Sequence, residues 1–418
     1  MSAAATAEPQ GVWRDVVGQG PAVAVLAAAA AAARSRLARG GGTTQAAAAG
    51  AEAAGMTHAW LLTGPPGSGR STAARAFAAA LHCEDDTAPP GCGRCSGCRT
   101  ALAGTHADVD VFATEHTQIR REDVEPLIAV AHRRPSLGRW RVVVVEDADR
   151  LNETSGNTLL KSIEEPPEQT VWLLCAPNVD DVLRTIRSRC RHVPLRVPPA
   201  SAVAELLQRR DGVDPAMAEF AARAAQSHIG FARRLARDEG ARIRRRDVLR
   251  LPSRADGVGR AVIAAGELVE VAQEEAKAAT AERDATERAA LMRALGAEGS
   301  ATPPPAVRAQ VRQLEDDQKR RARRSQTDAL DRALVDLLGL FRDVLVVQLG
   351  AAVELVNGDQ RAEVERLARA SSAEDTMRRI DAIRTARTRL AGNVAPLLAV
   401  EAMALEFVPA RPGPRGDR

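Results

Sequence analysis

The stretch GPPGSGRST, which runs from Gly64 to Thr72, has the residue types and spacing of a phosphate-binding loop. Its glycines let successive backbone N–H groups converge on an anion, and the N-terminus of a following helix adds its dipole. The pattern G-x-x-x-x-G-K-[ST] is met at every fixed position but one, because Arg70 stands where lysine is expected. Ser71 takes the place of the magnesium ligand. The candidate nucleotide-binding residues of this loop are Gly64, Gly67, Gly69, Arg70, Ser71 and Thr72.

Arg70 keeps the positive charge of the usual lysine, but its planar fork is bulkier than a compact ammonium beneath the β- and γ-phosphates. Three interpretations stay open: the loop still holds a nucleotide, holds one without hydrolysing it, or is an inherited turn that binds nothing. Only three of the 58 basic residues are lysines, so a general replacement of lysine by arginine also explains the change. The sequence favours impaired or absent hydrolysis and leaves the binding of ATP with Mg²⁺ open.

A second element of a nucleotide site is the acidic pair Glu146-Asp147, which ends the predicted buried strand RVVVV, 141–145. Acids at the end of a buried strand form a Walker B element, in which the first helps to hold magnesium and the second polarises the attacking water. The order here is Glu-Asp instead of Asp-Glu, so Asp147 falls about one methylene short of a lytic water. Acids that cap a strand are often merely solvated, but beside a phosphate loop the nucleotide-site interpretation is favoured.

Four cysteines, Cys83, Cys92, Cys95 and Cys98, lie close together in the string C-EDDTAPPG-C-GR-C-SG-C. The two overlapping C-x-x-C steps place thiolates on a tight turn, and the upstream cysteine completes a tetrahedral set. In a cytosolic protein such spacing predicts zinc in place of disulfides. The sequence has no histidine or carboxylate at a spacing that would indicate an open coordination position. The expected role of this zinc is therefore structural.

The elements that must position these residues alternate between apolar runs and helical patterns. The run before the loop, 59–63, predicts a buried strand, and the alanine-rich stretch 72–81 predicts a helix. Strands alternating with helices predict an α/β domain with a parallel sheet. Further strands are predicted at 108–112, 141–145 and 171–175, and further helices at 119–131, 157–165 and 182–187.

The stretch from Asn157 to Cys190 carries the most specific signals, LLKSIEEPP and a terminal SRC. Together with Gly18-Gln19 and a cysteine module straight after the phosphate-loop helix, these signals make the first half of the chain resemble the bacterial clamp-loader family, and within it the delta-prime subunits of DNA polymerase III. The resemblance implies an α/β RecA-like (AAA+) P-loop domain with a zinc insertion, then a small helical lid and an all-α collar. The implied domains are 1–197 with the zinc knuckle at 83–98, 198–250 for the lid and 251–418 for the collar.

The resemblance also gives meaning to the departures from the motifs. ATP-hydrolysing members carry a loop lysine, the Asp-Glu order, and a threonine or asparagine at the place where this chain has Cys175-Ala176-Pro177. Delta-prime subunits are stators that do not turn over ATP and supply the SRC arginine in trans. The resemblance therefore implies that Arg189 is an arginine finger for a neighbouring subunit's γ-phosphate. It also implies that Arg233, in the spacing Gly230-x-x-Arg233, is the sensor-two arginine of the lid.

The function that follows from this resemblance is that of a delta-prime-like clamp-loader subunit with little or no ATPase activity of its own. It would join gamma/tau and delta subunits in a hetero-oligomeric ring that loads the sliding clamp onto primer–template DNA during replication. Two alternatives stay open. One is a gamma/tau-like motor subunit that itself binds and hydrolyses ATP, which the otherwise intact loop favours. The other is a zinc-containing scaffold for protein interactions, in which Arg189 has no importance.

Composition limits the other classes of function. A net charge of +4 over 418 residues does not by itself argue for nucleic-acid binding. No apolar run approaches a bilayer span and no secretory pattern is visible, so we expect a cytoplasmic protein without membrane contact. The cluster QKRRARR, 318–324, has no interleaved aromatics, so a solvated helix face is favoured over DNA contact. A surface loop is predicted at 40–55, a Pro/Gly-rich break at 296–305, and helices at 259–295, 308–349, 361–390 and 394–407.

Overall fold

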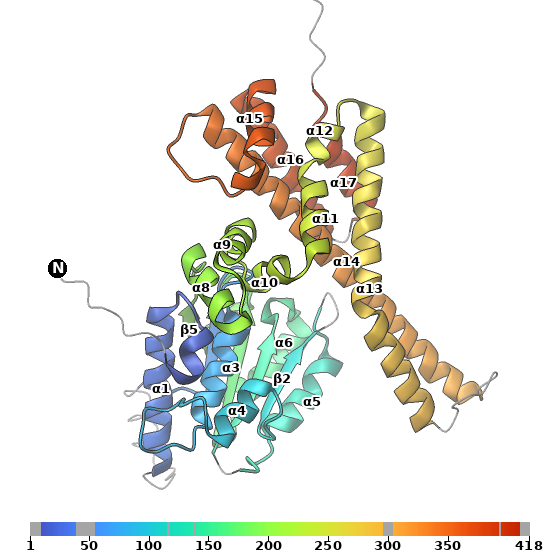
Figure 1. Cartoon of the computed structure of the whole chain (residues 1–418). Coiled ribbons are helices and arrows are strands. Elements are labelled where there is room, and N and C mark those ends of the chain that lie inside the picture. The colour runs from blue at the N-terminus through green and yellow to red at the C-terminus, as the bar shows by residue number, and fades with distance from the viewer. Residues whose placement is uncertain are drawn as a thin grey trace, which may run out of the picture. The chain divides into compact units, whose positions relative to one another are not determined.

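The computed structural model of the chain describes residues 10–38, 55–114, 118–137, 139–295, 304–392 and 394–409. The chain divides into two compact units, Met1–Arg237 and Asp238–Arg418. Figure 1 shows the first unit as a sheet flanked by helices and the second as helices alone. The surface loop predicted at 40–55 and the Pro/Gly-rich break predicted at 296–305 lie, apart from their last residues, outside the described residues.

The sheet of the first unit has five parallel strands in the order β2-β3-β4-β1-β5. Its three central strands are short continuous apolar runs, as expected for parallel strands that are covered on both faces. This arrangement confirms the predicted α/β class. The strands are β1 (Ala59–Thr63), β2 (Val109–Ala113), β3 (Arg141–Glu146), β4 (Thr170–Ala176) and β5 (Arg191–Pro194).

Successive residues of each central strand point into two separate cores. Trp60 and Leu62 pack into one core with the helices that precede and follow the phosphate loop, whereas Leu61 packs into the other. The first core is covered by α1 (Gly20–Ala38), α3 (Arg70–Leu81), α4 (Ser96–Ala103) and the 3-10 turn η1 (Gly11–Asp15). The second is covered by α5 (Arg121–Ala131), α6 (Glu153–Glu164), α7 (Arg184–Arg187) and the turn η2 (Ala148–Arg150).

Helix α1 is long and apolar enough, by length and composition, to cross a membrane, which differs from the expectation from the sequence. Its alanines raise the mean hydropathy without bulky side chains. One face of the helix, with Leu26, Ala29, Ala30 and Ala33, is fully buried in the first core. This one-sided burial is the packing of an amphipathic helix on an α/β domain.

A buried ion pair fixes the start of β2 against β3. The Asp108 carboxylate accepts hydrogen bonds from the backbone N–H groups of Ser136 (2.6 Å) and Leu137 (2.8 Å) and lies 3.1 Å from Nη2 of Arg141. Both charged side chains are almost fully buried, at 0% and 5% exposure. Burial alone would raise the pKa of Asp108. The backbone donors and the guanidinium outweigh this effect and hold the pKa below its usual range. The pair is therefore an ionised link inside the domain.

Three helices follow the sheet within the first unit: α8 (Ala200–Asp211), α9 (Pro215–Ala224) and α10 (Ile229–Arg237). They correspond to the predicted helical lid. The next helix, α11 (Glu239–Leu249), belongs to the second unit. The division into 1–197, 198–250 and 251–418 stays a prediction.

The second unit is all helical, as predicted. Two long helices, α13 (Val258–Ala294) and α14 (Pro305–Gln348), form a hairpin whose basal part joins the other helices in one core. Figure 1 shows the rest of the hairpin extending away from the other helices of this unit. The remaining elements are α11, α12 (Leu251–Arg254), η3 (Gly358–Gln360), α15 (Arg361–Ala370), α16 (Ala373–Ala391) and α17 (Pro396–Leu405).

A buried polar network ties the base of this unit together. Arg245 of α11 donates to Asp336 (2.9 Å) and to the side-chain oxygen of Asn357 (2.5 Å). Asn357 in turn donates from its backbone (2.7 Å) and its amide (2.9 Å) to Asp343. All four side chains are at most 6% exposed or wholly buried, so each polar group depends on its partners for hydrogen bonds.

Candidate functional site

The phosphate loop has the predicted strand–loop–helix geometry. It leaves β1 at Thr63 and enters α3 at Arg70, so Ser71 and Thr72 lie in the first turn of that helix. Gly67 and Gly69 have φ angles of 84° and 90°, in the left-handed region that disfavours other residues. The glycines therefore shape the loop as the motif requires.

Arg70 turns its side chain back onto the loop. Its Nη1 donates a hydrogen bond of 2.5 Å to the backbone carbonyl of Gly64, the first residue of the motif. In a nucleotide-binding loop the cation at this position extends to the β- and γ-phosphates. Here the guanidinium instead joins the end of the loop to its beginning.

The lid packs directly on the loop at Gly67. A Cβ atom placed on Gly67 would lie 2.5 Å from Cγ and 2.6 Å from Cα of His228, at the start of α10. His228 reaches this position because Gln226 and Ser227 adopt left-handed φ angles of 47° and 65° and turn the chain sharply. The approach of His228 was not predicted from the sequence, since no motif marks it. Gly67 is thus needed both for the turn and for this contact.

The two Walker B acids each lie beside an arginine. Glu146 at the end of β3 is 3.4 Å from Nη2 of Arg75, and Asp147 is 3.9 Å from Nε of Arg150. Asp147 has a left-handed φ of 59°, which directs it away from the line of the strand. The pair therefore lies at the predicted place, next to the phosphate-loop helix, with a cation beside each carboxylate.

Cys175 lies at the centre of the same region, where ATP-hydrolysing clamp-loader subunits are expected to have a polar sensor. Its thiol is buried, and burial followed by the negative charge of Glu146 raises its pKa to about 12. The charges of Arg70 and Asp147 also act on this thiol, which places all four residues in one neighbourhood. A neutral thiol is a poor replacement for a hydroxyl or amide that must hydrogen-bond a γ-phosphate.

Arg233, the predicted sensor-two arginine, is engaged inside the lid. Its Nε lies 2.9 Å from the carboxylate of Asp211 at the end of α8, and Asp211 also pairs with Arg210 and Arg237. The Asp211 side chain is only 3% exposed, so it depends on these cations. The sequence pattern that singled out Arg233 gave no indication of this carboxylate.

Arg189, the predicted arginine finger, lies after α7 with 40% of its side chain exposed. Its Nε is 2.5 Å from Oε1 of Glu164 at the end of α6, and its Nη1 donates to the Thr185 carbonyl (2.9 Å) and to Ser188 Oγ (3.2 Å). Glu164 belongs to the SIEEPP segment that helped to identify the family, but its contact with Arg189 was not foreseen. The guanidinium is therefore held at the surface, with part of it accessible.

A surface cavity of about 470 Å³ opens beside the start of α3. Thr72 and Arg75 line it from α3, Arg14 lines it from η1, and Arg209 lines it from α8. Arg209 also donates to the Arg14 carbonyl (2.7 Å), which joins η1 to the lid. The cavity has room for a ligand of the size of a nucleoside and carries a basic lining.

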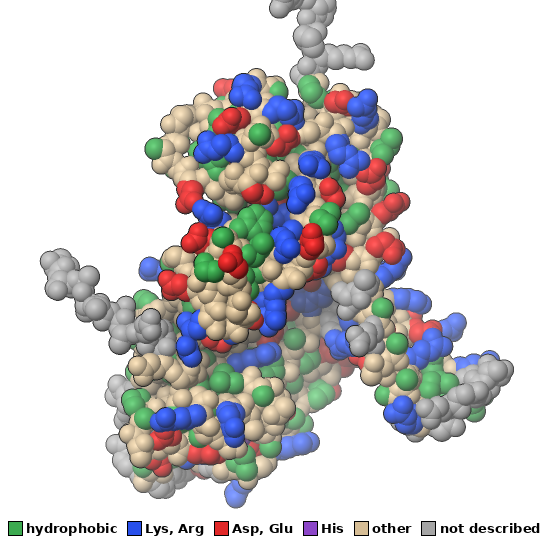
Figure 2. All heavy atoms as spheres, viewed as in Figure 1, with side chains coloured by type: hydrophobic (Ala, Val, Ile, Leu, Met, Phe, Trp, Pro, Cys, Tyr) green, Lys and Arg blue, Asp and Glu red, His purple; other side chains and the backbone are tan. Residues whose placement is uncertain are grey.

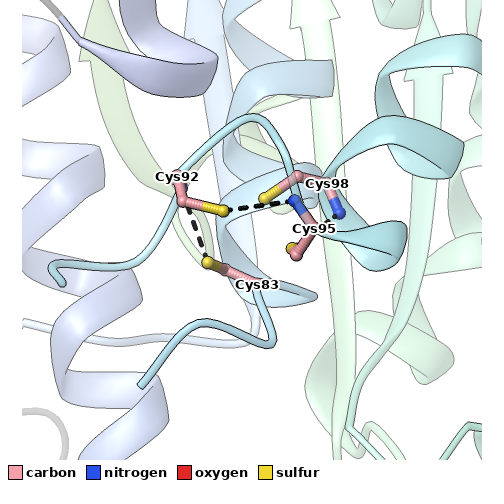
Figure 3. Close-up of side chains that lie close together, drawn as sticks. All are labelled: Cys83, Cys92, Cys95 and Cys98. Carbon is pink, nitrogen blue, oxygen red and sulfur yellow. Dashed lines mark hydrogen bonds between the residues drawn. The ribbon is translucent and has the colours of Figure 1, made fainter. Parts of the chain in front are cut away.

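The four cysteines converge as predicted (Figure 3), with their Sγ atoms all within 4.8 Å of one another. A tetrahedral zinc with bonds of about 2.3 Å requires sulfur separations of about 3.8 Å, so the set needs little adjustment to bind the ion. Backbone N–H groups point at the sulfurs: Cys92 at Cys83 (3.5 Å), Cys95 at Cys92 (3.4 Å) and Cys98 at Cys95 (3.4 Å). This donor pattern favours thiolates, and against the effect of burial it lowers the pKa of Cys83 to about 7.

The cysteine cluster is attached to the phosphate-loop helix. Cys98 Sγ lies 3.5 Å from the carbonyl of Ala79 in α3, and both Cys83 and Cys98 belong to the core that covers this helix. Cys83 also follows directly on His82, the C-cap residue of α3. The cluster therefore has a structural position, at the far end of the helix from the loop.

The structure brings the predicted loop residues and acids together but not the two distant arginines. Arg70, Glu146 and Asp147 share one region around Cys175, and the cysteines form their own cluster. Arg189 and Arg233 each pair with a carboxylate outside the loop, Glu164 and Asp211.

Comparison with protein families finds a match between residues 43–199 and the family described as "DNA polymerase III, delta subunit". The chain is 36% identical over 163 residues to DNA polymerase III subunit delta' of Pseudomonas aeruginosa, covering 38% of this chain and 50% of that protein. It is 32% identical over 161 residues to subunit gamma/tau of Mycobacterium tuberculosis, covering 38% of this chain and 28% of that protein. The chain thus spans half or less of the length of these relatives.

Among solved structures, the chain is similar to the RuvB Holliday junction branch migration motor of Thermotoga maritima, with 19% identity, coverage of 58% of this chain and 66% of that one, and a TM-score of 0.37. A DNA polymerase III, gamma subunit-related protein from the same species has 15% identity, coverage of 83% and 93%, and a TM-score of 0.36.

Proposed function

We propose that this chain, whose residues 43–199 belong to the family of DNA polymerase III clamp-loader subunits, is a delta-prime-like stator of the bacterial clamp loader. In this role it does not turn over ATP at its own loop and supplies Arg189 to the nucleotide of a neighbouring subunit. The observation that carries the proposal is the hydrogen bond from Arg70 to the Gly64 carbonyl, because it occupies the cation that a working loop directs at phosphates.

Three further contacts support the loss of hydrolysis. His228 abuts Gly67, and the sensor position holds the neutral thiol of Cys175. Arg233 is paired with Asp211, so using it at a nucleotide means giving up a bond to a nearly buried carboxylate. Each of these features makes the nucleotide-bound state less favourable than it would be at a loop with the usual lysine, sensor and free lid arginine.

The role of Arg189 follows from its position. Its side chain is 40% exposed, and its guanidinium is oriented by Glu164 and by the turn of α7. At a subunit interface such an arginine stabilises the charge that develops on a γ-phosphate during transfer. Glu164 then acts as a positioning residue. It holds the Arg189 guanidinium in place until the more highly charged γ-phosphate of the neighbouring subunit replaces it as the partner.

The metal and the partners follow from the same proposal. Cys83, Cys92, Cys95 and Cys98 hold a structural Zn²⁺ that secures the end of α3. The partners are gamma/tau and delta subunits in a hetero-oligomeric ring, and through that ring primer–template DNA. The protein acts in the cytoplasm, where bacterial DNA is replicated.

A gamma/tau-like motor subunit is the second candidate function. Gly67 and Gly69 have positive φ angles, Ser71 is in place, and several similar proteins are gamma or gamma/tau subunits. In that case Arg70 leaves the Gly64 carbonyl when ATP binds. The cavity beside Thr72 would then take the rest of the nucleotide.

The experiment that separates the two is ATP binding and turnover by the purified chain, with Arg70→Lys as the comparison. A stator shows no magnesium-dependent turnover, and Arg70→Lys increases ATP affinity because the shorter cation releases the Gly64 carbonyl. Steady turnover that is lost in Asp147→Asn would identify a motor subunit and refute the proposal.

A further inference from the structure

The distal part of the α13–α14 hairpin is a separate structural feature that the proposed function does not use. The core of the second unit takes residues from α13 only up to Ala272 and from α14 only from Ala329. Beyond these points the two helices pair mainly with each other, along an interface that we call the seam. Across it, Arg321 binds Asp284 (2.9 Å) and Glu287 (3.0 Å). The distal hairpin, 276–328, is therefore an arm with two helices and no share in the core.

The excess positive charge of the arm lies mainly on α14. Between residues 276 and 294, α13 has three acidic and four basic residues, whereas between 305 and 328, α14 has four acidic and seven basic residues. Some of these charges are used within the arm, as in the pair of Arg288 with Glu315 at 2.9 Å. The excess on α14 is positive and points outward.

Four of the basic residues of α14 form a stripe, which we call the basic stripe: Arg308, Arg312, Lys319 and Arg323. Their offsets of 4, 11 and 15 residues place them within about 60° of one another around the helix and along about 22 Å of its length. All four are exposed. Figure 2 shows Lys and Arg side chains on the visible surface of this arm.

The basic stripe is largely free of competing anions. Among the described residues, Arg308, Arg312 and Arg323 form no ion pair, and Lys319 has a 3.3 Å contact with the half-exposed Asp316. The side of α14 that meets α13, marked by the hydrogen bond from Gln318 to the Asp284 carbonyl, lies about 110° around the helix from the centre of the stripe. The stripe is thus turned away from the seam.

We propose that the basic stripe binds the phosphate backbone of a nucleic-acid duplex. None of the large hydrophobic residues exposed in the described part of the chain lies between 276 and 328, and the arm has no aromatic residue. A protein partner is anchored by apolar and aromatic side chains, and single strands are bound by stacking bases on aromatics. A row of cations without either matches sequence-independent phosphate contacts.

This inference goes beyond the proposed function and does not depend on it, because neither the phosphate loop nor Arg189 takes part. It also revises the expectation from the sequence that the cluster 318–324 is only a solvated face. Within that cluster, Arg321 faces the seam and Lys319 and Arg323 face outward, a distinction that the composition of the cluster conceals.

The test uses the purified full chain and a fluorescently labelled 30-base-pair duplex of arbitrary sequence, with anisotropy measured over a range of salt concentrations. The stripe variant carries Arg308→Gln, Arg312→Gln, Lys319→Gln and Arg323→Gln, which preserve helix propensity. The control variant carries the same number of changes at exposed, ion-paired arginines of α15 and α16: Arg361→Gln, Arg369→Gln, Arg378→Gln and Arg384→Gln. Both variants alter the net charge equally.

We expect the wild-type chain and the control variant to bind the duplex and the stripe variant to lose at least tenfold in affinity. The slope of log affinity against log salt should become less negative by about 3.6, which is about 0.9 for each lost phosphate contact. Equal losses in both variants, or no binding by the wild type at low salt, would overturn the inference. So would displacement of the duplex by poly-glutamate at the same concentration of charge, because that would identify an acidic protein as the better partner.

Discussion

Replacing Arg189 by alanine should separate stability from catalysis. The side chain is 40% exposed and its partner Glu164 is 39% exposed, so their ion pair is screened by water. Its loss, together with the bonds to Thr185 and Ser188, should lower the free energy of unfolding by about 1 kcal/mol or less. An arginine finger, in contrast, contributes about 10³-fold or more to the rate of phosphoryl transfer. That factor corresponds to about 4 kcal/mol of transition-state stabilisation.

The assay measures two quantities on the same variant. Chemical denaturation of the isolated chain gives the free energy of unfolding, and DNA- and clamp-stimulated ATP hydrolysis by the reconstituted loader gives the catalytic effect. The matched control is Arg187→Ala, which removes a neighbouring arginine of α7 whose partner is Asp180 at 2.5 Å. We expect Arg189→Ala to lower ATP hydrolysis by orders of magnitude and Arg187→Ala to leave it nearly unchanged.

Two results would refute this reasoning. If the loader with Arg189→Ala hydrolyses ATP at the normal rate, Arg189 does not act in trans, and the scaffold interpretation becomes the better one. If Arg189→Ala instead lowers stability by several kcal/mol, the side chain is structural, and a loss of ATPase activity then says nothing about catalysis. A double-mutant cycle with Glu164→Ala measures their coupling, which we expect to be about 0.5 kcal/mol for a pair this exposed.

Three further predictions concern the scaffold. Cys98→Ser should remove the zinc and lower the melting temperature, measured by metal analysis and calorimetry, whereas Cys190→Ser, outside the cluster, should keep the metal. Asp108→Asn should cost about 3 kcal/mol in the free energy of unfolding, because it leaves the buried Arg141 with a weakened partner. Since the pKa of Asp108 is lowered in the folded state, its stabilising effect is present above pH of about 4 and is lost as the pH falls, so acid should narrow the gap between Asp108→Asn and wild type. Asn357→Ala should destabilise the second unit by about 2 kcal/mol, since Arg245 loses one of its two buried acceptors and Asp343 loses the donor amide of Asn357. Denaturation followed by circular dichroism measures this loss, and an unchanged free energy of unfolding would contradict it.

Patterns within a few residues were predictable from the sequence. The apolar runs gave the central strands, the glycine spacing gave the loop, and two C-x-x-C steps gave the cysteine cluster, because each of these depends on neighbours along the chain. Most boundaries moved by one or two residues, as at α5, which begins at Arg121 while Ile119 forms a bridge with Leu151. Two helices begin earlier than predicted: α6 by four residues, at Glu153, and α14 by three, at Pro305. The placement of the loop residues, the acidic pair and the cysteines followed from the correct prediction of these strands and helices.

Contacts between distant elements were not predictable. Glu164 with Arg189, Asp211 with Arg233, and His228 against Gly67 each join residues whose proximity depends on how the helices pack. Glutamate and aspartate are common at exposed helix ends, so nothing in their local sequence distinguishes those that hold an important arginine. The outward direction of the basic stripe likewise depends on which side of α14 meets α13.

The strand order has a consequence for the growing chain. Strand β1, which carries the phosphate loop, lies between β4 and β5, and the residue of β5 that pairs with Trp60 is Arg191, 131 positions later in the sequence. At synthesis rates of about 5–20 residues per second, β1 waits roughly 7–26 s for its second neighbour to be made. During that time the segment AWLLT has an open edge and apolar side chains, the properties that favour aggregation. The strand on which the nucleotide site is built is therefore one of the first parts of the sheet to be synthesised and among the last to be enclosed.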